Sequence, residues 1–124
     1  MKHSIALFVA ALTFAASPAW AKDEHKPKYG GQVKEINEIQ YELVARPGVV
    51  TVFVEDHGKK IDTKGATGKA TLRQGTERSE VALLPAGDNK LEGKGTFKAA
   101  PGTTAIVQVT RAGKAEESVR FTLK

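Results

Sequence analysis

Two histidines and one aspartate are the residues of this chain best suited to hold a metal ion. His25 lies in a polar segment, and His57 follows Asp56 directly in a turn. Neutral imidazole and carboxylate are ligands that Zn and Cu(II) accept, and a tetrahedral zinc site takes three or four such groups. We therefore expect His25, His57 and Asp56 to bind Zn or Cu(II) weakly, with no tightly held cofactor. Two unconnected surface histidines fit the same spacing.

Catalysis has little support in the residue types. The chain has no cysteine, and no serine stands in a G-x-S-x-G motif. The adjacent carboxylates of Glu55 and Asp56 point to opposite faces of a strand, so they cannot act together on one substrate. The segment Gly65–Gly68 lacks the Lys-Ser/Thr ending of a phosphate-binding loop. A non-catalytic protein is expected.

The first 21 residues have the order of a secretory signal peptide. A basic start, Met1–Ser4, precedes an apolar run, Ile5–Ala16, and Ala19 and Ala21 are the small residues before a cleavage site. The apolar run has about a dozen residues, fewer than the ~20 that a membrane-spanning helix needs. We expect cleavage after Ala21, a periplasmic mature protein, and no transmembrane segment in it.

Composition limits the domain count and the class of partner. The 124 residues include 19 Lys and Arg, 14 Asp and Glu, and no cysteine. After cleavage the length suits one domain that can form a core without disulfides. The basic residues are scattered and have few aromatic neighbours, unlike a nucleic-acid-binding platform, so no nucleic-acid partner is expected. Weak attraction to anionic lipid or polysaccharide is compatible with this charge.

Alternating apolar residues predict an all-β domain. Short period-two segments are separated by turns rich in Gly and Pro, and Val49–Val54 is apolar on both faces, which favours a central strand. We expect a signal peptide over 1–21, a flexible polar arm over 22–29, and a β-domain over 30–124. The pattern predicts an immunoglobulin-like β-sandwich of seven or eight short strands. Its predicted core contains Val52, Leu72, Leu83, Val107, Val109 and Phe121.

Five segments of the chain together resemble a known family. They are Gly30–Val33, Tyr41–Val44, Val52–Gly58, Asp62–Gly68 and Pro85–Leu91. In this order they resemble a small periplasmic β-domain of proteobacteria, similar to the N-terminal domain of heavy-metal efflux membrane-fusion adaptors. The resemblance implies a role in heavy-metal handling, with a component of an envelope efflux system as partner. Tyr29 stands where the family's H-x-x-H-G-G pattern has its second histidine.

Two functions follow as expectations. The first is a secreted periplasmic, non-catalytic binding or accessory protein linked to heavy-metal handling or efflux. The alternative is a structural or adhesive β-sandwich module that binds a protein or a glycan in the cell envelope. The number of histidines bears on this choice, because metal storage or buffering would need more ligands than two.

Overall fold

The chain folds into antiparallel β-strands, which confirms the predicted all-β class. The computed structural model describes residues 26–124, so the predicted signal peptide and His25 lie outside the described residues. Within that range no helix is long and apolar enough to cross a membrane. The strands are β1 Gln32–Ile36, β2 Ile39–Arg46, β3 Val49–Asp56, β4 Lys59–Lys60, β5 Thr67–Gln74, β6 Glu77–Pro85, β7 Lys90–Lys94, β8 Thr104–Thr110 and β9 Glu116–Thr122.

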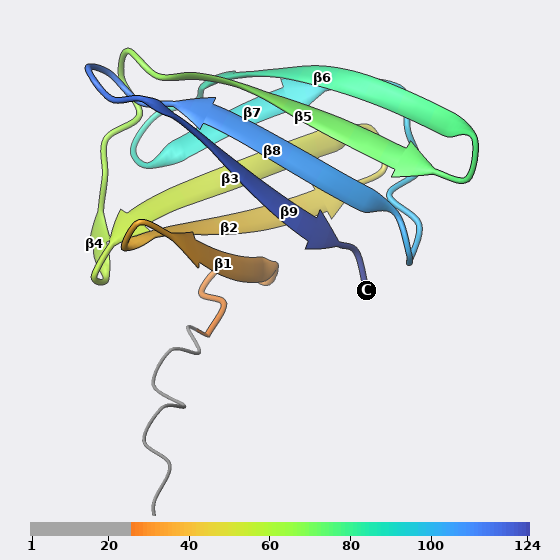
Figure 1. Ribbon diagram of the computed structural model, residues 1–124, viewed down its shortest axis with the longest axis horizontal. Helices are drawn as coiled ribbons and strands as arrows, with labels where there is room; N and C mark the ends of the chain where they lie inside the picture. The colour runs from red at the N-terminus through yellow and green to blue at the C-terminus, as the bar shows by residue number, and fades with distance from the viewer. Residues whose placement is uncertain (1–25) are drawn as a thin grey trace, which may run out of the picture.

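The strands form one nearly closed sheet with two packed halves (Figure 1). Hydrogen-bonded neighbours follow the order β1-β2-β3-β7-β6-β5-β8-β9, and the short β4 pairs with β3. One half contains β1, β2, β3 and β7, and the other contains β5, β6, β8 and β9. Strand β6 joins them, because Leu84 and Pro85 pair with β7 while the rest of the strand pairs with β5.

A side chain closes the sheet where β1 meets β9. The Gln32 amide donates from Nε2 to the carbonyl oxygen of Thr122 at 2.8 Å and accepts from the backbone N–H of Lys124 at 3.3 Å. It thereby takes the place of a peptide group between the two edge strands, which lie side by side. Covering strand edges in this way removes a site at which other chains could add a strand.

A polar cluster holds the same seam at its other end. The hydroxyl of Tyr41, which is fully buried on β2, donates to Glu117 on β9, and Asn37 Nδ2 donates to Glu117 at 3.1 Å. Arg111 lies 3.6 Å from the same carboxylate. Burial, followed by the hydrogen bond to Glu117, raises the pKa of Tyr41 above its ordinary value, so the tyrosine stays a neutral donor.

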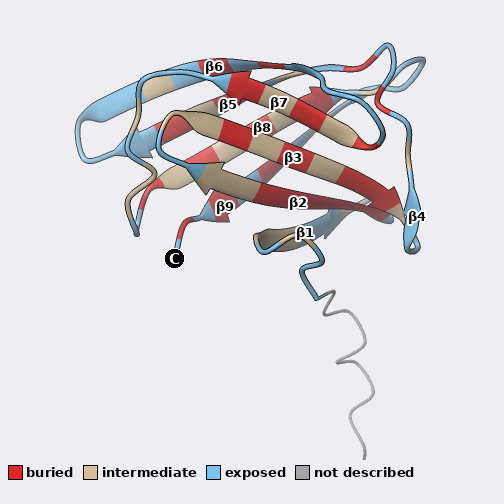
Figure 2. Ribbon diagram, turned by 180° about the vertical axis from the view of Figure 1, so that it is seen from behind, coloured by how far each residue is buried: buried red, intermediate tan, exposed pale blue. Residues whose placement is uncertain are grey.

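The core lies between the two halves of the sheet (Figure 2). Every second residue of each long strand points inward, as period-two apolar patterns require. All six predicted core residues belong to one buried cluster, which confirms that prediction; they are Val52, Leu72, Leu83, Val107, Val109 and Phe121.

Two tight hairpin turns at one end of the sheet position residues of the candidate site. Asn37 and Glu38 join β1 to β2 with φ of 51° and 69°, and His57 and Gly58 join β3 to β4 with φ of 52° and 83°. Two-residue turns with positive φ at both positions match the twist of paired strands. Because Ile39 pairs with Asp56, the two turns are neighbours in space.

Candidate functional site

The N-terminal segment lies across the outer face of β2 and β3. The ring of Tyr29 stacks on that of Phe53, with centroids 3.7 Å apart and planes 7° from parallel. Phe53 belongs to the second apolar face of its strand, and the arm covers that face at Phe53 and Glu55. Of the flexible arm predicted over 22–29, the structure describes 26–29, and both Lys28 and Tyr29 are bonded to the sheet. We call the surface formed by Lys28, Tyr29, Glu42, Phe53 and Glu55 the arm site.

Glu42 binds the backbone of the arm. Its carboxylate accepts hydrogen bonds from the N–H groups of Lys28, Tyr29 and Gly31, each at 2.8 Å. Glu42 is only 5% exposed, so these donors take the place of water around a buried charge. Position 31 must be glycine, since a Cβ there would lie 2.1 Å from the carbonyl oxygen of Leu43.

Glu55 binds the two side chains of the arm. It accepts from Lys28 Nζ at 2.7 Å and from the Tyr29 hydroxyl at 2.9 Å. The hydrogen bond to Glu55 raises the pKa of Lys28, which keeps its ammonium group charged. A cavity of about 250 Å³ remains beside these groups, and Lys26 and Gly58 lie at its wall. The arm site therefore recognises a lysine, an aromatic ring and a run of backbone donors together.

His57 lies in the β3–β4 turn between two carboxylates. Its Nδ1 is 2.5 Å from Asp56 Oδ1, and its Nε2 is 3.6 Å from Glu38 Oε1 on the neighbouring turn. The hydrogen bond to Asp56 raises the pKa of His57, and the charges of Asp56, Glu38 and Glu35 add to this effect. The imidazole is 68% exposed, so solvent reaches it freely.

The predicted metal ligands are only partly described. His57 and Asp56 are in contact, as their adjacency predicts, whereas His25 lies outside the described residues. Within residues 26–124, no group of three or more His, Asp or Glu is arranged to hold a metal ion. The described end of the arm nevertheless reaches this turn, because Lys26 and Gly58 line one cavity. His25 directly precedes Lys26 in the sequence.

Sequence reasoning missed the arm site. Glu42 and Glu55 stand in strand patterns, where a carboxylate is ordinarily read as solvent-exposed, yet both are buried. A signal was present in Phe53, because a strand that is apolar on both faces needs a cover on each. The sequence does not reveal that this cover is the arm, since the contacts join residues far apart along the chain.

A second, larger cavity lies at the other end of the fold. It has a volume of about 420 Å³ and separates the β5–β6 hairpin from the segment 96–103. Leu72 and Phe97 supply apolar wall, whereas Arg78 and Lys98 supply charge. Thr103 also lines it, and its hydroxyl oxygen is buried with no hydrogen-bond partner among the described residues. Of the predicted site residues that the structure describes, Asp56 and His57, neither lies there.

Comparisons with protein families, with curated proteins and with solved structures find no match to this chain. Its chemistry is therefore interpreted from the arm site and from the turn that carries His57.

Proposed function

We propose that this chain is an exported, non-catalytic binding protein of the periplasm that takes up a divalent metal ion weakly and serves a heavy-metal efflux system. The proposed metal site is the β3–β4 turn together with the arm. The export signal in 1–21 and the resemblance to efflux-adaptor domains support the location and the partner. We also propose that the two packed halves form an immunoglobulin-like sandwich, supported by their shared apolar core.

The observation that carries the metal proposal is the position of His57 beside two carboxylates. In a tetrahedral zinc site with bonds of about 2.0–2.1 Å, neighbouring ligand atoms lie about 3.3 Å apart. The 3.6 Å between His57 Nε2 and Glu38 Oε1 is close to that edge length. Asp56, which the sequence predicted as a ligand, lies 2.5 Å from Nδ1, and in this proposal it orients the imidazole so that Nε2 faces Glu38. Glu38 then takes the place of Asp56 as the carboxylate ligand.

His25 is the third protein ligand in this proposal. The described residues alone supply too few ligands, and the arm reaches the wall of the cavity beside Gly58. Two imidazoles and a carboxylate, with water in the fourth position, would hold Zn or Cu(II) only weakly. Protonated imidazole cannot ligate, and the pKa of His57 is raised. As the pH is lowered, metal binding should therefore begin to weaken before the pH reaches about 6.5, and it should weaken further at lower pH.

Calorimetric titration with Zn and with Cu(II) tests this function. The wild type should bind about one ion, and a His25→Ala, His57→Ala double variant should bind none. Glu38→Gln should weaken binding, whereas Glu80→Gln, which removes a carboxylate from the far half of the sheet, should not. Equal binding by the wild type and the double variant, or binding by neither, would contradict a metal role.

The arm site favours a second candidate, a module that binds a protein segment in the envelope. Glu42, Glu55 and Phe53 already hold a lysine, a tyrosine and three backbone donors, so a similar basic and aromatic segment of another protein fits the same chemistry. A labelled peptide of residues 25–31 should bind in trans to a Lys28→Ala, Tyr29→Ala variant. The same peptide with both alanines is the control, and equal binding of the two peptides would exclude this candidate.

A further inference from the structure

The outer face of β5, β6, β8 and β9 gathers basic side chains, most of which have no partner among the described residues. Alternation along these strands turns the residues between the core positions outward, opposite to the arm site. We call this surface the basic face. Its cations are Lys69, Arg73, Arg78 and Arg120, and its anions are Glu80 and Glu116.

Two of these cations face each other across neighbouring strands. Arg73 on β5 is the register partner of Arg78 on β6, and both side chains are exposed. Like charges placed directly opposite on a sheet destabilise it. Arg78 is offset by Glu80, at 2.9 Å, whereas the guanidinium group of Arg73 has no ion pair or hydrogen bond with any described residue. The repulsion is a small cost to folding, and it leaves the guanidinium group of Arg73 available to an anion from outside.

Hydrogen-bonding side chains separate the cations. Thr104 on β8 lies in register between Arg73 on β5 and Thr122 on β9. Arg120 on β9 pairs with Ile106 on β8, which is two residues beyond Thr104 and points to the same face. Arg120 therefore shares this face with Arg73, and β8 lies between their two strands. Two strand spacings amount to about 9–10 Å. The face thus presents cations at intervals, with hydroxyl and amide groups between them.

The neutral side chains of this face indicate the kind of anion. They are mostly hydroxyls and amides: Thr71, Thr104, Thr110, Gln108, Ser118 and Thr122. Membrane-surface proteins instead present aromatic or leucine anchors beside their cations. Two large apolar side chains share this face, the half-buried Ile106 on β8 and Leu84, the only strongly exposed one among the described residues. Leu84 lies at the opposite end of β6 from Arg78, so it is not an anchor beside the arginine pair. Hydroxyls beside guanidinium groups match a sugar polymer that carries carboxylates, because Arg binds a carboxylate with two parallel hydrogen bonds.

We propose that the basic face binds an acidic polysaccharide, with Arg73 and Arg120 pairing to uronate carboxylates and the intervening threonines bonding to sugar hydroxyls. This binding is independent of the metal and of the arm site, which lie on the other half of the sheet. Because the contacts are exposed, salt should weaken them: the screening length falls from about 10 Å at 0.1 M to about 3 Å at 1 M.

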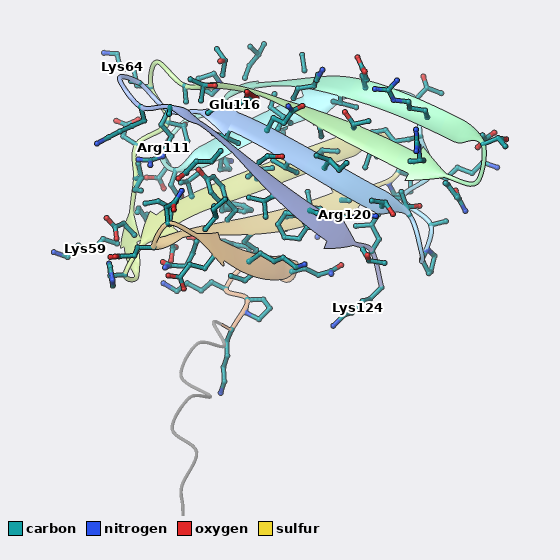
Figure 3. The ribbon with its side chains drawn as sticks, viewed as in Figure 1. Lys59, Lys64, Arg111, Glu116, Arg120 and Lys124 are labelled. Atoms are coloured by element: carbon teal, nitrogen blue, oxygen red, sulfur yellow. The ribbon has the colours of Figure 1, made fainter. Side chains whose placement is uncertain are left out.

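Polygalacturonate is the probe, and binding to the purified protein is measured by calorimetry at low salt. An Arg73→Gln, Arg120→Gln double variant should bind at least about fivefold more weakly, since each exposed ion pair contributes modestly. A Lys59→Gln, Lys64→Gln double variant is the matched control, because it loses the same charge at the end of the molecule near β4, away from Arg120 (Figure 3). The control should bind within about twofold of the wild type.

Three results would overturn the proposal. The first is the absence of polygalacturonate binding at low salt. The second is equal weakening in the two double variants, which would mean that net charge alone attracts the polymer. The third is stronger binding to vesicles with about one-third anionic lipid than to polygalacturonate, which would assign the face to a membrane surface. Neutral dextran should not bind, and circular dichroism should show both variants folded.

Discussion

Glu42→Gln should release the arm from the sheet while leaving the rest of the fold intact. Glutamine keeps the size of glutamate but retains one acceptor oxygen, and its amide group is a donor. If that oxygen serves Tyr29 and Gly31, the amide N–H₂ faces the N–H of Lys28, and two donors oppose each other. The remaining two bonds also lose the charge that strengthens them.

The size of the effect has two limits. Three bonds of 2.8 Å to a buried carboxylate would contribute about 1.5–3 kcal/mol each if no relaxation were possible. The arm can undock instead, so the loss cannot exceed the free energy of docking. The ring stack on Phe53 and the contacts of Glu55 favour docking, but ordering each arm residue costs about 1–2 kcal/mol. We therefore expect the free energy of unfolding to fall by about 1–3 kcal/mol.

Urea unfolding and amide hydrogen exchange measure this prediction. In Glu42→Gln the amides of Lys28, Tyr29 and Gly31 should exchange faster, while core amides change only with global stability. Glu92→Gln is the matched control, because Glu92 lies on β7 and its side chain makes no hydrogen bond with a described residue. If Glu42→Gln changes stability and arm exchange no more than Glu92→Gln does, the proposed role of Glu42 is wrong.

Three further substitutions test the core, the buried hydroxyl and the charged turn. Phe121→Ala should lower the free energy of unfolding by about 3–5 kcal/mol in urea titration, because the ring is fully buried; a loss below about 1 kcal/mol would contradict its place in the core. Thr103→Val should raise stability by about 1 kcal/mol, since the hydroxyl has no described partner, and a loss would indicate an unrecognised bond. The pKa of His57 is raised, so its contribution is complete below about pH 6.5 and is lost as pH rises through the folded-state pKa. The stability difference between wild type and His57→Gln should therefore shrink with rising pH, and a growing difference would refute this.

Local patterns were enough to predict eight of the nine described strands and the side of each that is buried. The prediction of seven or eight strands missed β4, because two exposed lysines carry no apolar alternation. Thr103–Thr110 alternates polar and apolar residues and contains β8, and the apolar positions on either side of Asn37 and Glu38 form β1 and β2. Val49–Val54 was predicted to be central, and β3 does lie between β2 and β7. Strand positions and buried faces depend on residues that are close together in the sequence, so one sequence is enough to predict them.

The contacts that join distant segments could not be predicted in this way. The pairing of β3 with β7, and of β5 with β8, depends on which strand edges meet after folding. The closure by Gln32 depends on a side chain acting as a peptide group, and no local pattern marks it. The candidate site shows the same division: Asp56 and His57 touch because they are adjacent, whereas Glu38 joins them only through the register of β2 and β3.

The arm links the two candidate functions, and this link can be measured. If His25 shares a metal ion with His57, metal binding must stabilise the docked arm, and docking must strengthen metal binding by the same factor. The apparent metal affinity is then proportional to the fraction of molecules whose arm is docked. Because Glu42→Gln lowers this fraction, it should weaken Zn binding about fivefold. Glu42 lies on β2 and its carboxylate is occupied by the arm backbone, so a lost ligand cannot explain such a change. Zn should also slow exchange of the Tyr29 amide in the wild type. Unchanged Zn affinity in Glu42→Gln, with faster arm exchange, would exclude His25 from the site and leave the metal to the turn alone.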